Sequence, residues 1–253
     1  MLFRSTLRRA MLGDCWEYDI RSAVITWKLT FAEELAQQLN PLKTYESQFW
    51  ASHLYVTGRR EFMRDVCNET FGKNSGLTKD FQDSLIKQAI TAIGFGAKAS
   101  GNGWRLQDGS WANPSIVSIL TNHDERGKFL SCPIIEKFIS EQLQIDKYLE
   151  SEMKHELPEI YYGPLITANV NPSRSKAVAY LYQHQETRAM NVAREVLQKY
   201  GIKPIADIHD AFVVKKKLSN YVRDEINFRM QTEMKNQYLL LKFTNLNGFK
   251  YQN

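Results

Sequence analysis

The spacing of hydrophobic positions along the chain predicts a mainly helical protein. Apolar side chains recur every three or four residues over most of its length, which is typical of helices that pack one face on a core. The segments with this pattern are residues 20–39, 45–71 with a break near Gly58, 81–94, 129–156, 173–200 and 218–236. Gly201 follows the fifth segment, at a place where glycine often ends a helix in a left-handed conformation.

Four short segments have the pattern of β-strands instead. They are residues 13–18, 205–208, 211–214 and 238–243. Only His209 and Asp210 separate the second segment from the third, which predicts a hairpin with a short tip. Because one strand lies near the start of the chain and the others near its end, the predicted fold class is α+β, with one small antiparallel sheet beside many helices.

Composition excludes several classes of protein. The chain has 253 residues, of which 43% are hydrophobic and 24% charged, and this excludes collagen-like, disordered and low-complexity proteins. No hydrophobic run reaches the roughly 18 residues of a membrane span, and the first residues are too rich in arginine for a signal peptide. We therefore expect a cytoplasmic protein without a membrane partner. The net charge of +5 is compatible with a phosphate-rich partner but does not establish one.

The three cysteines are odd in number and far apart in the sequence. They are Cys15, Cys67 and Cys132. Since they lack the paired spacing of a zinc site or a disulfide framework, we expect reduced, buried thiols.

Two aspartates at strand ends are the candidates for chemistry. Asp19 follows the first predicted strand and Asp210 lies at the hairpin tip, 191 residues later. If the two strands share one sheet, the carboxylates converge, and two aspartates can hold a pair of Mg²⁺ ions about 3.5–4 Å apart for in-line phosphoryl displacement. Lys87, on the polar side of its predicted helix, adds a cation that can neutralise a triphosphate and protonate a leaving pyrophosphate. These residues predict a two-metal nucleotidyl transferase.

Two segments around these aspartates resemble motifs of the single-subunit RNA polymerases of phages and mitochondria, which are relatives of family A DNA polymerases. Residues 16–24 resemble motif A, in which a strand ends in the first metal-binding aspartate, here Asp19. Residues 199–212 resemble motif C, in which a helix ends at a Tyr-Gly turn and a strand then carries the second metal-binding aspartate, here Asp210.

A third segment, residues 87–98, resembles motif B of the same family. In that motif a lysine is followed eight residues later by an aromatic residue and a glycine, here Lys87, Phe95 and Gly96. The three motifs occur in the family order A, B, C, which strengthens the resemblance.

The resemblance implies a right-hand polymerase that carries out DNA-dependent RNA synthesis with two Mg²⁺ ions. Its partners would be a DNA template, an RNA product and NTPs, in the cytoplasm of a phage-infected bacterial cell. The palm would comprise residues 1–40 and 157–253, with largely helical fingers at 41–156. The catalytic residues implied are Asp19, Asp210 and Lys87, and the metal ligands implied are Asp19, Ile20 and Asp210. The nucleotide-binding residues implied are Lys87, Phe95, Gly96, Arg188 and His209.

The sequence departs from the family pattern at three positions near the expected substrate. The family usually has an arginine four residues before the motif B lysine, where this chain has Asp83. RNA polymerases of the family usually have tyrosine at Phe95 and a small residue at Val24. The choice between rNTPs and dNTPs therefore stays open, and a DNA polymerase or primase of the same fold is the first alternative. A catalytically silent, polymerase-like nucleic-acid-binding subunit is the second.

The thumb and N-terminal domain of the family precede motif A, whereas only 18 residues precede Asp19. From this we expect a second protein subunit that supplies the thumb in a heterodimer, as in a split phage RNA polymerase; a reduced enzyme without a thumb is the alternative. We expect it to contact the helices predicted at 20–39 and 45–66, because they are rich in aromatic residues. These residues are Trp27, Phe31, Phe49 and Trp50.

Each candidate also has an ordinary structural explanation when it is taken alone. An aspartate at a strand end is usually a turn or N-cap residue, and a tip such as His209-Asp210 is common in tight turns. The three lysines at 215–217 are most simply a solvated run, with contact to a nucleic-acid backbone as the alternative. The ordered set of three motifs favours the functional interpretation of Asp19 and Asp210.

Overall fold

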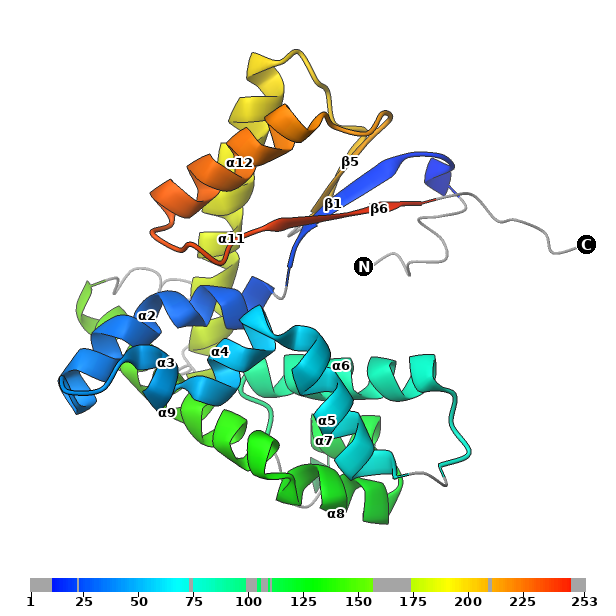
Figure 1. Ribbon diagram of the computed structural model, residues 1–253, viewed down its shortest axis with the longest axis vertical. Coiled ribbons are helices and arrows are strands. Elements are labelled where there is room, and N and C mark those ends of the chain that lie inside the picture. Colours follow the sequence, from blue (N-terminus) through cyan, green and yellow to red (C-terminus); the bar gives the residue numbers. More distant parts are fainter. Residues whose placement is uncertain are drawn as a thin grey trace, which may run out of the picture. The chain divides into compact units, whose positions relative to one another are not determined.

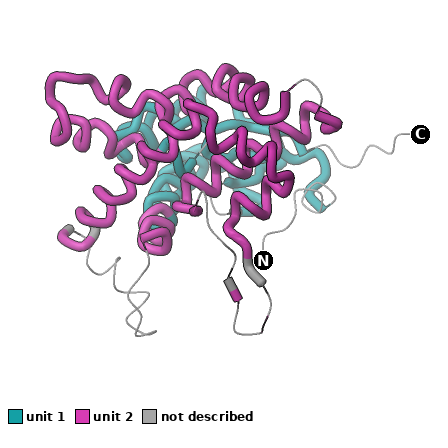
Figure 2. The backbone as a smooth tube through the Cα atoms, turned by 90° about the horizontal axis from the view of Figure 1, so that it is seen from below, with its two compact units in different colours: residues 1–26, 183–253 teal, residues 27–182 magenta. Residues whose placement is uncertain are grey.

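The computed structural model describes residues 11–21, 23–72, 75–98, 104–105, 109, 111–156, 174–208 and 211–246. The chain divides into two compact units, which Figure 2 colours teal and magenta. Unit 1 comprises residues 1–26 and 183–253, and unit 2 comprises residues 27–182. Among the described residues, no helix is long and apolar enough to cross a membrane.

Unit 1 contains a four-stranded antiparallel sheet. Its strands are β1 (Trp16–Ile20), β4 (Ala206–Ile208), β5 (Ala211–Val214) and β6 (Leu241–Asn245), in the order β4-β5-β1-β6. The first strand of the chain therefore lies between the second strand of the hairpin and the last strand. This confirms the predicted α+β class with a small antiparallel sheet.

One face of the sheet packs against helix α12 (Asn220–Glu233). On this face Tyr18 stacks on Phe212, with ring centroids 5.3 Å apart, and its hydroxyl accepts a hydrogen bond of 2.8 Å from the backbone N–H of Leu218, just before the helix. Val222 and Ile226 of α12 are buried. The core of unit 1 therefore contains Tyr18, Phe212, Val222 and Ile226, whose side chains are at most 6% exposed.

Helix α11 (Arg174–Lys199) enters unit 1 at residue 183 and lies beside α12 (Figure 1). Two ion pairs of 2.7 Å join the helices, Lys199 with Glu225 and Arg229 with Glu195. The helix ends as predicted, because Gly201 has a φ of 64° and its N–H donates to the carbonyl of Gln198 while the N–H of Ile202 donates to that of Leu197.

Unit 2 consists mainly of helices. They are α2 (Ala23–Leu39), which begins in unit 1, α3 (Tyr45–Gln48), α4 (Trp50–Thr57), α5 (Arg59–Phe71), α6 (Lys79–Gly94), α7 (Ser115–Ile119), α8 (His123–Ser131) and α9 (Pro133–Glu156). The short strands β2 (Trp104–Arg105) and β3 (Trp111–Ala112) pair antiparallel. Edge-to-face contacts between Tyr55, Phe62 and Phe138, with centroids 5.1–5.9 Å apart, join α4, α5 and α9 at the centre of the core.

Helix α4 begins at an unusual cap. Its N-cap residue, Phe49, has no side chain that can accept a hydrogen bond, and the buried carboxylate of Glu141 from α9 takes this role instead. Glu141 accepts hydrogen bonds from the backbone N–H of Ser52 at 2.7 Å and of Ala51 at 3.2 Å. Burial raises the pKa of Glu141, while these hydrogen bonds favour its charged form.

Several predicted boundaries were wrong, among them the last strand, which spans Leu241–Asn245 instead of 238–243. The helix predicted at 129–156 is two helices, because Pro133 has no N–H to continue α8 and instead begins α9. The break near Gly58 is confirmed, but a second break lies at Phe49. The first strand extends to Ile20, so Asp19 lies inside β1 rather than at a strand–helix junction.

The aromatic side chains assigned to a partner interface are largely used within unit 2. Trp27 is 5% exposed and its ring contacts Phe31 and Tyr182, while Phe49 is fully buried. The expectation that these two residues form an exposed apolar patch was therefore wrong. Of the four aromatic residues named for the interface, Trp50 is exposed, at 38%. The three cysteines are free and buried, as predicted.

Candidate functional site

The pairing of β1 with β5 brings the two aspartate-bearing segments together. Asp19 lies opposite Ala211 of β5 and opposite Lys242 of β6. The condition that the strands next to Asp19 and Asp210 share one sheet is met, and β1 and β5 are direct neighbours. Asp19 is half-buried at this position.

The hairpin of β4 and β5 has the predicted short connection. Ile208 pairs with Ala211, so two residues connect the strands. These two residues, His209 and Asp210, lie outside the described residues. Asp210 is bonded directly to Ala211, which is the residue that faces Asp19 across the ladder.

Asp19 belongs to the face of the sheet opposite α12. Neighbouring residues of a strand point to opposite faces, and Tyr18 points toward the start of α12. Further along the same face as Asp19, a small apolar cluster contains Cys15, Val213 and Leu246. The hydrocarbon side chain of Ile20 is buried, so only its backbone carbonyl could serve as a metal ligand.

The residues that resemble motif B begin at Lys87 in the middle of α6 and continue past the end of this helix in unit 2. Lys87 is exposed, whereas Ile86 and Ile90 are fully buried, as expected for a lysine on the polar side of an amphipathic helix. Phe95 is half-buried and its ring meets the ring of Tyr182 edge-on at 5.5 Å. Lys87 and Phe95 therefore stand on one continuous helix and its C-cap.

Gly96 has a clear structural reason to be glycine. Its φ is 76°, and its N–H donates to the carbonyl of Ile93 at 2.8 Å while the N–H of Ala97 donates to that of Ala92 at 2.9 Å, which closes the helix. A Cβ atom at this position would lie 3.1 Å from the Cβ of Ser175, at the start of α11. The end of motif B is thus a tight helix stop.

A buried ion pair lies next to this helix stop. The ammonium of Lys28 on α2 contacts the carboxylate of Asp146 on α9, and both side chains are almost fully buried. Asp146 is also the acidic residue nearest a Cβ built at Gly96, with Oδ2 3.6 Å away. Burial lowers the pKa of Lys28 and raises that of Asp146, and their mutual attraction opposes both shifts.

Asp83, at the position where the family has arginine, is held within unit 2. Its carboxylate forms an ion pair of 3.0 Å with Lys79, one helical turn earlier, and accepts a hydrogen bond of 3.2 Å from the thiol of Cys67. Burial, together with Asp83, raises the pKa of Cys67 to about 11. Arg59, another cation of unit 2, stacks over the ring of Tyr55 at 4.8 Å.

The predicted site residues fall in both units. Asp19, Ile20 and Arg188 belong to unit 1, whereas Lys87, Phe95 and Gly96 belong to unit 2. Arg188 is exposed on α11, and its guanidinium donates to the amide oxygen of Gln185 at 3.3 Å. Within unit 1 the structure brings Asp19 next to β5, whereas in unit 2 Lys87 lies two helical turns before Phe95 and Gly96.

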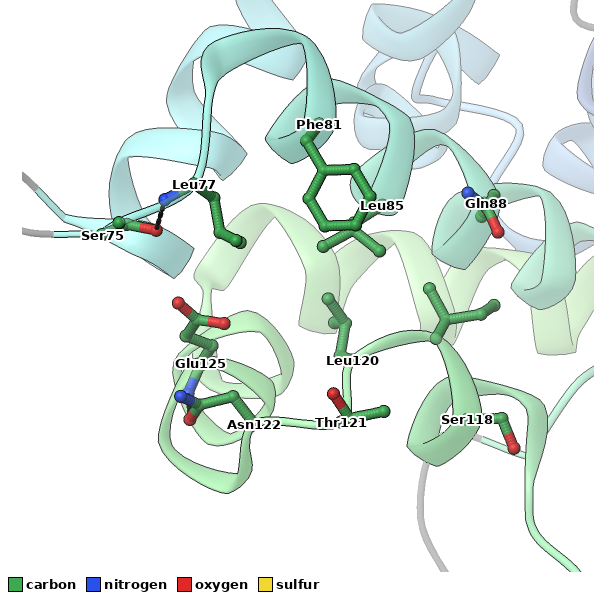
Figure 3. Close-up of a pocket in the computed structure, with 12 residues that line it drawn as sticks. Ser75, Leu77, Phe81, Leu85, Gln88, Ser118, Leu120, Thr121, Asn122 and Glu125 are labelled. Atoms are coloured by element: carbon green, nitrogen blue, oxygen red, sulfur yellow. Dashed lines mark hydrogen bonds between the residues drawn. The ribbon is translucent and has the colours of Figure 1, made fainter.

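A pocket of about 690 Å³ in unit 2 does not contain the predicted site residues (Figure 3). Leu77, Phe81 and Leu85 from the α6 side face Leu120 from the segment after α7, and Glu125 lies at one end. None of the lining residues is lysine or arginine, so the pocket itself offers no cation for a triphosphate.

Comparison with known protein families found no match for the chain, and comparison with curated protein sequences found none either. Within the described part of the chain, no cluster of three or more His, Cys, Asp or Glu residues could hold a metal ion. The candidate site thus depends on the geometry of β1 and β5 and on the resemblance of the motifs.

Proposed function

We propose that this chain is a template-directed nucleotidyl transferase that synthesises RNA on a DNA template. The observation that carries the proposal is the pairing of β1 with β5, which puts Asp19 opposite the residue that follows Asp210. Asp19 and Asp210 are 191 residues apart in the sequence, so nothing local requires their segments to be neighbours. A two-metal carboxylate site does require it.

The donor chemistry at this end of the sheet suits magnesium. Carboxylates and backbone carbonyls are hard oxygen ligands, and Asp19, Asp210 and the carbonyl of Ile20 are of this kind. The Asp19 residue is half-buried, and its Oδ1 atom is buried. In the proposal these three residues hold two Mg²⁺ ions, which would stabilise the charge on the attacking and leaving oxygens of phosphoryl transfer.

The other residues of the chain act on the nucleotide. The exposed ammonium of Lys87 would pair with the triphosphate and donate a proton to the leaving pyrophosphate. Phe95 would offer a ring surface to the incoming base, and Gly96 keeps the end of α6 free of a side chain. Arg188 and His209 would contact the nucleotide from unit 1.

Two alternatives remain tied to particular residues. Phe95 has no hydroxyl to select the ribose, and Val24, at the other position considered for sugar choice, is 6% exposed. The first alternative is therefore a DNA polymerase or primase of the same fold, which would use the same carboxylates. A catalytically silent nucleic-acid-binding subunit is favoured by Asp83, which is paired with Lys79 where the family has an arginine. A thumb-bearing second subunit stays an expectation, without the exposed Trp27 and Phe49 surface first assigned to it.

Primer extension on a DNA template with Mg²⁺ tests the proposal, with rNTPs and dNTPs compared and co-purifying proteins retained. Asp19→Asn should lower incorporation by more than about 100-fold at an unchanged melting temperature, because it removes one carboxylate charge from the site. Glu17→Gln is the matched control, since Glu17 is also half-buried on β1 and shares the face of Asp19. It should retain incorporation within about threefold.

The result also separates the alternatives. Incorporation of dNTPs alone would establish the DNA polymerase alternative. An absence of template-dependent incorporation with either class of nucleotide, or an equal loss in the Asp19 and Glu17 variants, would overturn the proposal.

A further inference from the structure

A cluster of cations lies at the end of the sheet remote from Asp19. Trp16 begins β1 and pairs with Val214, the last residue of β5, and with Asn245, the last residue of β6. Lys215, Lys216 and Lys217 follow Val214 directly and are exposed. We call these lysines, together with Arg223 of α12, the basic cluster.

Aromatic rings hold part of the basic cluster in place. The ammonium of Lys217 lies 5.1 Å from the ring centroid of Trp16 and 4.8 Å from that of Phe243. The guanidinium of Arg223 lies 5.1 Å from the same Phe243 ring. Two cations that share one ring at these distances are at most about 10 Å apart, and cation–π contacts of this kind fix their positions without neutralising them.

The backbone of the cluster is also anchored. Leu218, next to Lys217, is 5% exposed and donates its N–H to the hydroxyl of Tyr18. Ser219 then caps α12 by accepting a hydrogen bond of 3.3 Å from the N–H of Val222. The lysines are thus a short track on a fixed segment, which differs from a run of lysines in a loose loop.

The charge of the cluster is not balanced locally. Among the described residues, no carboxylate lies within 4 Å of Lys215, Lys216 or Lys217. Arg223 has only a long contact of 3.5 Å with the exposed Asp224. A cluster of four cations with one long carboxylate contact among the described residues favours a ligand with several closely spaced negative charges.

We propose that the basic cluster binds the sugar–phosphate backbone of a single-stranded nucleic acid. Phosphates follow one another every few ångströms along a strand. Lys217 and Arg223, at most about 10 Å apart, together with Lys215 and Lys216 directly before Lys217 in the chain, can meet about three consecutive phosphates. The choice of nucleic acid over another polyanion rests on the proposed function.

The cluster is a contact separate from the candidate catalytic end. Trp16 and Asp19 are three residues apart on β1, which is about 10 Å along a strand, and they point to opposite faces of the sheet. A strand bound at the cluster therefore does not occupy the Asp19 position. It would hold template or product while the proposed reaction takes place elsewhere.

The experiment measures binding without catalysis. Fluorescence anisotropy of a labelled single-stranded 16-mer of deoxythymidine is followed in EDTA, without nucleotides, over a series of salt concentrations. The test variant is Lys215→Ser/Lys216→Ser/Lys217→Ser. Because each phosphate contact contributes about 0.7 to the slope of log K against log salt for a single strand, the slope should decrease by about 2, and the affinity in 0.1 M salt should fall about 100-fold.

A matched control removes the same charge elsewhere. Lys43→Ser/Lys128→Ser/Lys147→Ser takes three exposed lysines from unit 2, none of which is in the cluster. Its slope should change by less than one contact, about 0.7. Equal losses in both triple variants would show a net-charge effect, and no loss in the test variant would show that the cluster is not used; either result overturns the inference.

Two further arms separate the inference from its competitors. If the test variant loses binding to vesicles with anionic lipid but keeps its affinity for the oligonucleotide, the surface is a lipid contact and the inference is wrong. Asp19→Asn should bind the oligonucleotide as the unsubstituted chain does. A failure of incorporation together with cluster-dependent binding would refute the proposed function alone.

Discussion

Substituting Lys28 by methionine tests the buried ion pair of unit 2. The Lys28 side chain is 0% exposed and that of Asp146 3% exposed, so neither charge reaches water. Methionine keeps the apolar stem of the lysine and removes only the ammonium. The variant therefore leaves a buried carboxylate without its cation, which is far more unfavourable than the absence of the whole pair.

The magnitude follows from the proton that Asp146 must then take up. Protonation in the folded state requires about 1.4 kcal/mol for each pH unit above the ordinary carboxyl pKa of 3.8. The free energy of unfolding should fall by about 4 kcal/mol at pH 7, within the range of about 3–5 kcal/mol for broken buried pairs. In the variant the folded-state pKa of Asp146 lies above its unfolded value, so the destabilisation shrinks as the pH falls and is under about 2 kcal/mol at pH 5.

Urea denaturation at pH 7 and pH 5, followed by circular dichroism, measures both values. The double variant Lys28→Met/Asp146→Leu removes both charges and should be within about 1 kcal/mol of the original chain at either pH. A loss below about 1 kcal/mol for Lys28→Met at pH 7, or a loss that is the same at both pH values, would refute the reasoning. So would a double variant that is as unstable as the single one.

Two other predictions concern two helix-ending glycines and one buried thiol. Gly96→Ala should reduce the free energy of unfolding by more than Gly201→Ala. Both glycines have a left-handed φ, where alanine costs about 1–2 kcal/mol of strain, but only a Cβ at position 96 would lie 3.1 Å from Ser175. Equal losses in thermal denaturation would contradict this. Cys67, with its pKa raised to about 11, should react with iodoacetamide at pH 8 only after unfolding, and the rate in the folded protein should still be rising at pH 10. Mass spectrometry of the modified thiols checks it, and rapid alkylation of folded protein at pH 8 would contradict it.

The local pattern of the chain was sufficient to predict most helices and the hairpin. Helices α6, α11 and α12 and the turn at Gly201 lie where the apolar spacing and glycine positions put them. Each of these features depends on residues close in sequence, so hydrophobic periodicity contains the information. The pairing of β1 with β5 could be stated only as a condition, because strand partners 191 residues apart leave no signal in a single sequence.

Buried charges were missed because a periodic pattern treats every charged residue as exposed. Glu141 falls within the helix predicted at 129–156, where periodicity gives no reason to bury a glutamate, yet it caps α4 through Ser52. Lys28 did leave a signal, since it lies between Trp27 and Leu29 in a mainly apolar stretch, and a lysine there must either reach solvent or find a partner. Which partner it has depends on α9, more than 100 residues later, and no local pattern names it.

The departure at Asp83 has a different meaning in the structure from the one it has in the sequence. In the sequence it is a missing arginine that weakens the resemblance at the triphosphate. In the structure Lys79, Asp83 and Lys87 follow one another at four-residue intervals along α6, and Asp83 is neutralised by Lys79, one turn away from the expected substrate contact. The carboxylate therefore does not oppose the ammonium of Lys87 with a full negative charge. In the proposal, Lys87 would hold the triphosphate, and Lys79, which is paired with Asp83, would be a weaker second cation than the arginine of the family. A substitution at Asp83 would therefore change only this weaker contact. The Asp19 and Glu17 variants are the ones that discriminate between a working polymerase and a silent relative.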